Sequence, residues 1–346
     1  MLVPSPQQRT PRRPAALRRP VLLAALLAGV LLACLASVMI GAKAVAVPDV
    51  LRALAGERSG DALVVSELRF PRTLLGLLVG VCLGAAGTIA QAVTRNPLAD
   101  PGLLGVSAGA AVAVAAGIGV LGLTSPLQYV WFAFAGAALA GALVYLIGGT
   151  GRGGASPVKL ALAGAAITAL LGSVTYALVL LDVRTLDQYR FWAVGSLAGR
   201  DGELAAKLAP FAIAGLVLAL ALTPKLNALE LGDELASSLG VKVGATRLLG
   251  ALAVVTLTGA AVAAAGPVTF VGLVVPHVMR AFTGPDLRWL LPASALGGAV
   301  LLLGADTLGR VLDHPAEVQA GVVTAFAGAP FLIALVRRGK LREHTR

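Results

Sequence analysis

Long apolar runs separated by short polar segments dominate the chain. We place ten such runs, at residues 21–42, 72–94, 103–121, 127–148, 158–181, 207–223, 247–266, 268–283, 288–306 and 317–336. Most are close to the roughly 20 residues that a helix needs to cross the hydrocarbon core of a bilayer. The pattern predicts an all-α integral membrane protein with about ten transmembrane helices in one domain, 21–336.

Composition narrows the class of protein. Of the 346 residues, 58% are hydrophobic and 13% are charged, whereas a soluble domain is about 45–50% apolar and about 25% charged. This excludes a soluble enzyme, a secreted disulfide scaffold and a disordered chain. Gly76, Gly80 and Gly84 recur every fourth residue in the second run. Because such spacing lets helix backbones approach closely in lipid, it predicts a packing ridge there.

The charges indicate the orientation of the chain in the membrane. The net charge is +11, and the lysines and arginines lie mostly between apolar runs, in an Arg/Pro-rich N-terminal tail (1–20) and in a basic C-terminal tail (337–346). Membrane orientation explains this distribution better than nucleic-acid binding. An even number of runs places both termini on one side, and most Lys and Arg then fall on that side, so we expect cytoplasmic termini. The first run resembles a signal peptide, but its length favours a retained helix.

The interiors of the runs are nearly free of ionisable groups, His277 near a helix end being the exception. Ion-coupled transporters usually place Asp, Glu, His or Lys there, so the pattern disfavours an ion-coupled carrier, and a membrane-embedded enzyme would need acid/base clusters. The sequence contains no Gly-x-x-x-x-Gly-Lys-[Ser/Thr] nucleotide-binding loop. Active transport would therefore take its energy from another chain. Cys34 and Cys82 fit inert packing positions, and we expect no metal or cofactor site.

The densest motif follows the second run. It reads Arg95-Asn96-Pro97-Leu98-Ala99-Asp100-Pro101, with Gln91 before it and Gly105 after it. Pro97 forces Asn96 out of helical geometry, and two prolines bracket the break. We predict that Arg95 and Asp100 hold this turn at the membrane interface. The motif closely resembles the FecCD-type permeases, the transmembrane subunits of ABC importers for iron–siderophore complexes, haem and cobalamin.

Further motifs match that family in its order. They are Leu68-Arg69-Phe70-Pro71-Arg72, Trp192-x-x-Gly195-Ser196-Leu197, Gly266-Pro267, Pro276-His277-x-x-Arg280, Asp306-x-x-x-Arg310 and Gly321-Val322-Val323-Thr324. We interpret Pro276, His277 and Arg280 as a structural helix end, with Arg280 near terminal carbonyls. The chain departs from the family at Gln319, where a proline is usual.

The resemblance implies a cobalamin-importer-like permease fold in the bacterial inner (cytoplasmic) membrane. It implies a second permease subunit, identical or related, and two ATPase subunits that hold ATP and Mg²⁺, so that this chain needs no cofactor. It also implies an outer substrate-binding protein. A ferric siderophore is the expected cargo, with cobalamin and haem left open.

The resemblance also assigns roles to two sets of residues. Arg69, Arg72 and Arg310 resemble the docking residues for the binding protein, and a guanidinium suits a partner carboxylate. Segment 226–244 resembles the coupling loop that contacts the ATPase. From the residues themselves, this loop predicts short helices in which Asp233 caps a turn, Leu235 and Leu239 share a face and Gly240 ends the turn. Glu230, Asp233 and Glu234 would fit an anionic lipid surface poorly, which favours a soluble partner.

Overall fold

The computed structural model describes residues 18–41, 43–57, 59–150, 156–200, 202–313 and 316–343, and these are helical apart from their connections. Residues 1–17 of the predicted N-terminal tail and 344–346 of the C-terminal tail lie outside the described residues. The long elements are α1 (Arg18–Met39), α4 (Phe70–Thr94), α5 (Val106–Gly119), α6 (Pro126–Gly149), α7 (Pro157–Leu181), α9 (Gly202–Glu230), α11 (Val243–Ala265), α12 (Val271–Thr283), α13 (Leu287–Leu312) and α14 (Ala320–Glu343).

Each predicted apolar run corresponds to one of these helices. Seven are long and apolar enough to cross a membrane, judged by length and composition, while Val106–Gly119, Val271–Thr283 and Ala320–Leu335 are apolar but shorter. At 1.5 Å per residue, the first two of these short helices reach only about 20 Å of a hydrocarbon core of about 30 Å. Within the part of the chain that the structure describes, seven helices are therefore candidate spans, and the count of ten stays a prediction.

Several short helices were not predicted from the sequence. They are α2 (Val47–Leu54), α3 (Gly60–Val64) with a π-helical turn at Val65–Arg69, a 3-10 turn at Pro101–Leu104 and α8 (Val183–Ala193). The short helix α10 (Asp233–Ser238) lies in segment 226–244, where short helices were predicted. Helix α9 also continues past its predicted end at 223 through Pro224. Leu226 and Leu229 of this extension are fully buried, so packing compensates for the proline.

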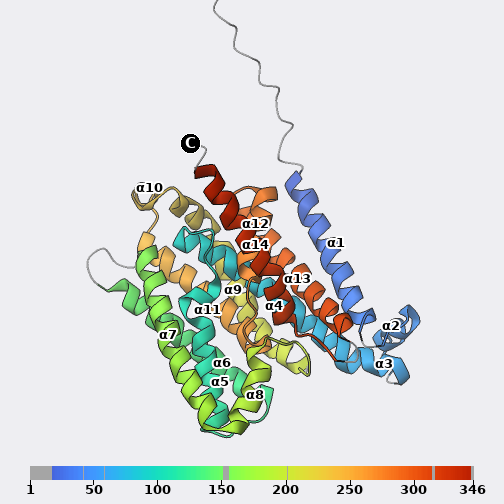
Figure 1. Ribbon diagram of the computed structural model, residues 1–346. Coiled ribbons are helices and arrows are strands. Elements are labelled where there is room, and N and C mark those ends of the chain that lie inside the picture. Colours follow the sequence, from blue (N-terminus) through green and yellow to red (C-terminus); the bar gives the residue numbers. More distant parts are fainter. Residues whose placement is uncertain are drawn as a thin grey trace, which may run out of the picture.

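Helix α4 forms the centre of the bundle and packs on α13, α11, α9 and α12 (Figure 1). The predicted glycine ridge is a packing surface, and the structure shows that it faces α13. A Cβ atom at Gly84 would lie 2.0 Å from the carbonyl oxygen of Ser294, and one at Gly80 would lie 2.6 Å from that of Gly298. Only glycine allows this approach of two backbones, so the ridge sets the α4–α13 distance.

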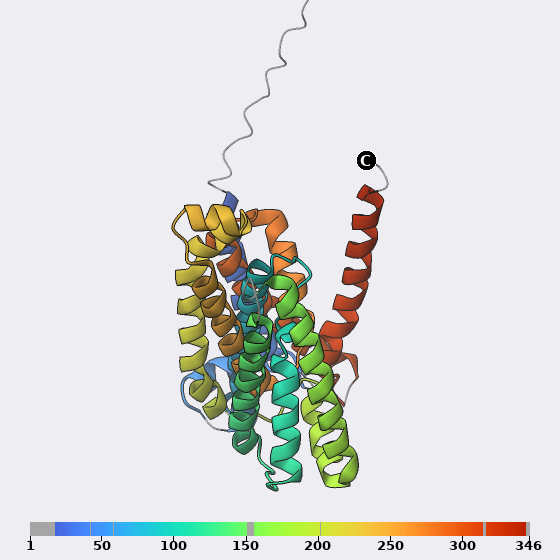
Figure 2. The ribbon, with the colours of Figure 1, turned by 90° about the vertical axis from the view of Figure 1, so that its left-hand side faces the viewer.

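The described chain ends gather at one end of the bundle. The start of α1, helix α10 and the end of α14 lie there, whereas α2, α3 and α8 lie at the opposite end (Figure 1). We call the first the terminal end and the second the far end. Helix α14 stands apart from most of the bundle (Figure 2) and contacts mainly α13 and α12.

Candidate functional site

At the far end, the three arginines of the predicted docking site line one pocket, and two of them, Arg72 and Arg310, bind acids. Arg72 donates from Nη2 to Oδ1 of Asp306 at 2.8 Å and from Nη1 to Oε2 of Glu317 at 2.7 Å. Arg310 donates from Nη2 to Oδ2 of Asp306 at 2.8 Å. The buried Asp306 carboxylate thus binds two guanidinium groups, and its pair with Arg72 joins α13 to α4.

Arg69 and Arg310 also close the end of α1. Arg69 donates from Nη1 to the carbonyls of Val38 and Met39, both at 2.8 Å. Arg310 donates to the carbonyl of Ser37 at 2.7 Å and to that of Ile40 at 3.1 Å. The last carbonyls of a helix have no partner within it, and here buried arginines supply the missing donors.

This engagement changes the interpretation of the three arginines. Arg69 and Arg310 are 7% and 3% exposed, so neither presents a free guanidinium to a partner. They do line a pocket of about 540 Å³, together with Lys43, Arg200 and other residues. The docking role stays a prediction, and the structure adds that all three side chains line this pocket.

At the terminal end, the helix break after α4 has the predicted geometry. Arg95 adopts a left-handed conformation (φ 49°) after the last helical residue, Thr94. The Asn96 side chain accepts a hydrogen bond from the Leu98 amide at 2.9 Å, and Asp100 accepts one from Gly102 at 2.8 Å to begin the 3-10 turn. The chain then enters α5 through Gly105 at φ +73°.

Two details of this region differ from the predictions. Arg95 does not hold the turn with Asp100 but pairs with Asp233 at 3.2 Å. Asp233 does not cap α10, since Gly232 occupies the N-cap position and no side chain caps it. The Asp233 carboxylate instead binds Arg247 of α11 at 2.8 Å as well. Asp233 thus ties α10 to α11 and to the end of α4.

Helix α10 carries an exposed apolar surface. Leu235 and Leu239 are 57% and 65% exposed, and Leu231 just before the helix is 60% exposed. Gly240 at φ +80° ends the helix, as predicted, and the Val241 amide donates back to the Ala236 carbonyl at 3.0 Å. Glu230 at the end of α9 and Glu234 in α10 are exposed beside these leucines.

A buried amide joins α4 to α12. Gln91 is 2% exposed and donates to the Leu273 carbonyl at 3.3 Å, while Arg280 donates to the Gln91 side-chain oxygen at 3.4 Å. The placement of Arg280 near terminal carbonyls stays a prediction, and the structure adds its contact with the Gln91 oxygen. Pro276 lies inside α12, and His277 packs edge-on against Phe331 of α14.

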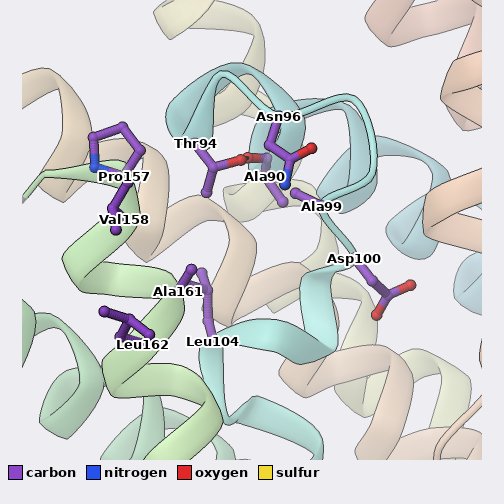
Figure 3. A pocket seen from close by; sticks show the side chains of 10 residues that line it. All are labelled: Ala90, Thr94, Asn96, Ala99, Asp100, Leu104, Pro157, Val158, Ala161 and Leu162. Atoms are coloured by element: carbon purple, nitrogen blue, oxygen red, sulfur yellow. Dashed lines mark hydrogen bonds between the residues drawn. The ribbon is translucent and has the colours of Figure 1, made fainter. Parts of the chain in front are cut away.

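A pocket of about 320 Å³ lies beside the helix break, with Thr94, Asn96 and Asp100 on one side and Pro157 and Val158 of α7 on the other (Figure 3). Pro101 packs against Gly272, where a Cβ atom would lie 2.7 Å from the proline ring. Burial raises the pKa of the Asp100 carboxyl, against the opposing effect of the hydrogen bond from Gly102. Among the described residues, no group of three or more His, Cys, Asp or Glu is placed to hold a metal ion.

The model of the FecCD transport family matches residues 26–338. The chain belongs to the FecCD transport family. It is 46% identical to the ferric enterobactin transport system permease protein FepD of Escherichia coli, over 93% of this chain and 97% of FepD. It is 43% identical to the Fe(3+)-citrate import system permease protein YfmD of Bacillus subtilis, over 87% of this chain and 90% of YfmD.

A solved structure agrees with this assignment. The fold matches an inward-facing conformation of a putative metal-chelate type ABC transporter with a TM-score of 0.81 at 28% identity, covering 92% of this chain and 99% of that one. The chain is therefore a multi-pass membrane protein and a transport permease, not an enzyme. As an ABC importer permease, it requires ATPase and binding-protein partners.

Sequence reasoning missed the acids that satisfy the arginines. Asp306 and Arg310 are four residues apart and share a helix face, which was an available signal. Glu317 and the Asp233 pairs left no local signal, because their partners lie elsewhere in the chain.

Proposed function

We propose that the chain is the permease subunit of an ABC importer that carries a ferric siderophore across the bacterial inner membrane. Its similarity to FepD along almost the full length of both chains is the observation that carries the proposal. The cargo crosses between two permease subunits, identical or related, each a single transmembrane domain (21–336) with ten spans.

The terminal end is the cytoplasmic end in this proposal. The excess of Lys and Arg in the segments on that side supports it. Two ATPase subunits, which hold ATP and Mg²⁺, contact segment 226–244 there. Exposed leucines on a helix that is tied to the bundle through Asp233 form a rigid apolar projection, which suits a groove on a soluble partner.

A double substitution tests this contact. Leu235→Ser with Leu239→Ser removes the apolar surface and leaves the Asp233 ties in place. We expect ATPase subunits to co-purify poorly with this variant and uptake to fall at least tenfold. Leu121→Ser, which changes a similarly exposed leucine (58%) between α5 and α6, is the control. Full ATP-driven uptake by the double variant would contradict the assignment of the coupling loop.

The outer binding protein docks over the far-end pocket in this proposal. Charge reversal of Arg69, Arg72 and Arg310 is a poor test, because it would bury several acids around Asp306 and prevent folding. Arg200→Glu is a better one, since Arg200 lines the same pocket and its guanidinium binds the hydroxyl of Tyr129 at 3.2 Å rather than a buried acid. We expect weaker docking of the binding protein with unchanged assembly.

The cargo is tested by uptake in cells that lack their own importer. We expect a complex containing this chain to restore uptake of ⁵⁵Fe-labelled ferric siderophore in the presence of its binding protein. Uptake of labelled cobalamin or haem, but not of the siderophore, would leave the assignment as an ABC importer permease in place and would contradict the siderophore as its cargo.

A further inference from the structure

Arg72 meets two acids in very different surroundings. Asp306, on α13, is 1% exposed and takes the Nε and Nη2 donors of Arg72 at 3.0 Å and 2.8 Å. Glu317 lies between α13 and α14, is 34% exposed and takes the Nη1 donor at 2.7 Å. The inner side of the guanidinium is therefore fixed within the bundle, while its outer side is held by an acid that solvent reaches.

The two ion pairs also differ in how much their loss would cost in stability. Asp306 accepts from Arg310 as well, and removal of a buried acid with two partners would leave two cations uncompensated. The Glu317 pair is partly solvated, and such pairs contribute little net stability. If another carboxylate replaces that of Glu317 at the Nη1 donor of Arg72, the charge of the site is conserved.

The charge of the far-end pocket favours binding of an acidic group from a partner. The pocket that contains this pair is lined by Lys43 and by the four arginines already described, against Glu67 and Glu317 as its acids. A concave surface with an excess of one charge attracts and orients a partner of the opposite charge.

We propose that Glu317 is a built-in substitute for an acidic side chain of the outer binding protein. In the undocked permease it occupies the outer donor of Arg72, and on docking a partner carboxylate takes that donor and Glu317 moves away. This proposal rests on the proposed function, because it assumes that a binding protein docks over the pocket.

Because of its position, a movement of Glu317 would be transmitted to the helices of the bundle. The next residue, Val318, donates to the Gly309 carbonyl at 3.0 Å, and α14 begins at Ala320. A movement of Glu317 therefore acts on the short connection that places α14, the helix that stands apart in Figure 2.

The test measures docking of the siderophore-loaded binding protein of the same importer to the full complex in nanodiscs. Glu317→Gln keeps the shape of the side chain and removes its charge, so the internal competitor is weakened. We expect docking to tighten by roughly three- to tenfold at constant ionic strength. Glu67→Gln removes a charge from the same pocket without touching Arg72, and Glu203→Gln removes one that pairs with Lys207 on α9. Both controls should change docking by less than twofold.

A second measurement keeps Glu317 intact. A nitroxide on Ala316→Cys, in a Cys34→Ser background with Cys82 fully buried, reports the connection directly. We expect its mobility to rise on docking. Unchanged or weaker docking of Glu317→Gln, an equal gain in Glu67→Gln, or unchanged nitroxide mobility would overturn the exchange while leaving the proposed function standing. Failure of the wild-type complex to dock any binding protein would remove both.

Discussion

Whether a glycine-to-alanine substitution stabilises or destabilises this protein should depend on its position, and the glycine ridge of α4 allows a test. In the middle of a helix, replacing glycine by alanine normally stabilises by up to about 1 kcal/mol, because glycine loses more backbone entropy on folding. At Gly84 the added Cβ would lie 2.0 Å from the Ser294 oxygen, and that atom belongs to the backbone, which cannot rotate away.

Helices α4 and α13 would have to separate by on the order of 1 Å to accept the methyl group. Overpacking of this kind costs about 1–3 kcal/mol, and the separation also loses a quarter to a half of the dispersion attraction across the gap. The cost therefore exceeds the gain from helix propensity, and Gly84→Ala should destabilise the protein.

Gly304 provides the matched control. It lies on α13, and a Cβ atom there would meet nothing within 4 Å. Gly304→Ala should leave the unfolding temperature unchanged or raise it slightly, while Gly84→Ala should lower it by several degrees.

A thiol-reactive dye can follow the thermal unfolding of detergent-purified protein, since Cys82 is fully buried in the folded state. The Cys34→Ser background limits the signal to Cys82. Equal unfolding temperatures for the Gly84 and Gly304 variants would refute the inference that close backbone contact sets the α4–α13 distance.

Three further substitutions test individual contacts. Asp233→Asn removes the charge that pairs with Arg95 and Arg247 and so loosens α10; we expect more ATP hydrolysed per iron transported, and an unchanged ratio would exclude a role in coupling. Arg310→Met removes one of the two guanidinium groups that bind Asp306 and the donors to the Ser37 and Ile40 carbonyls, and we expect a loss of about 3–5 kcal/mol, seen as poor yield of folded protein; wild-type yield and melting would contradict the buried network. Gln91→Leu removes the amide between α4 and α12, and we expect a lower unfolding temperature from a loss of about 1–3 kcal/mol; an unchanged melting curve would show that the amide is not a tie.

Local features of the sequence predicted much of the fold. The apolar runs located the helices, and glycines four residues apart located a packing ridge on α4, though not the helix that it contacts. The break at Arg95–Pro101 and the end of α10 at Gly240 also followed from the sequence, because proline and glycine restrict the backbone of their own neighbours.

The partners of the charged residues could not be predicted in the same way. Arg72 and Asp306 are 234 positions apart, and Arg72 and Glu317 are 245 apart. Their meeting depends on how α4 and α13 pack, which no local pattern records. For the same reason Asp233, a plausible helix cap in sequence, serves instead as a bridge between helices.

In this proposal the chain is a passive permease that separate ATPase subunits must drive. The most direct measurement is uptake of ⁵⁵Fe-labelled ferric siderophore into proteoliposomes that contain either this chain alone or the complete complex with its binding protein. We expect uptake only by the complete complex supplied with ATP and Mg²⁺ on the ATPase side. Uptake by this chain alone, driven by a proton or sodium gradient, would contradict it.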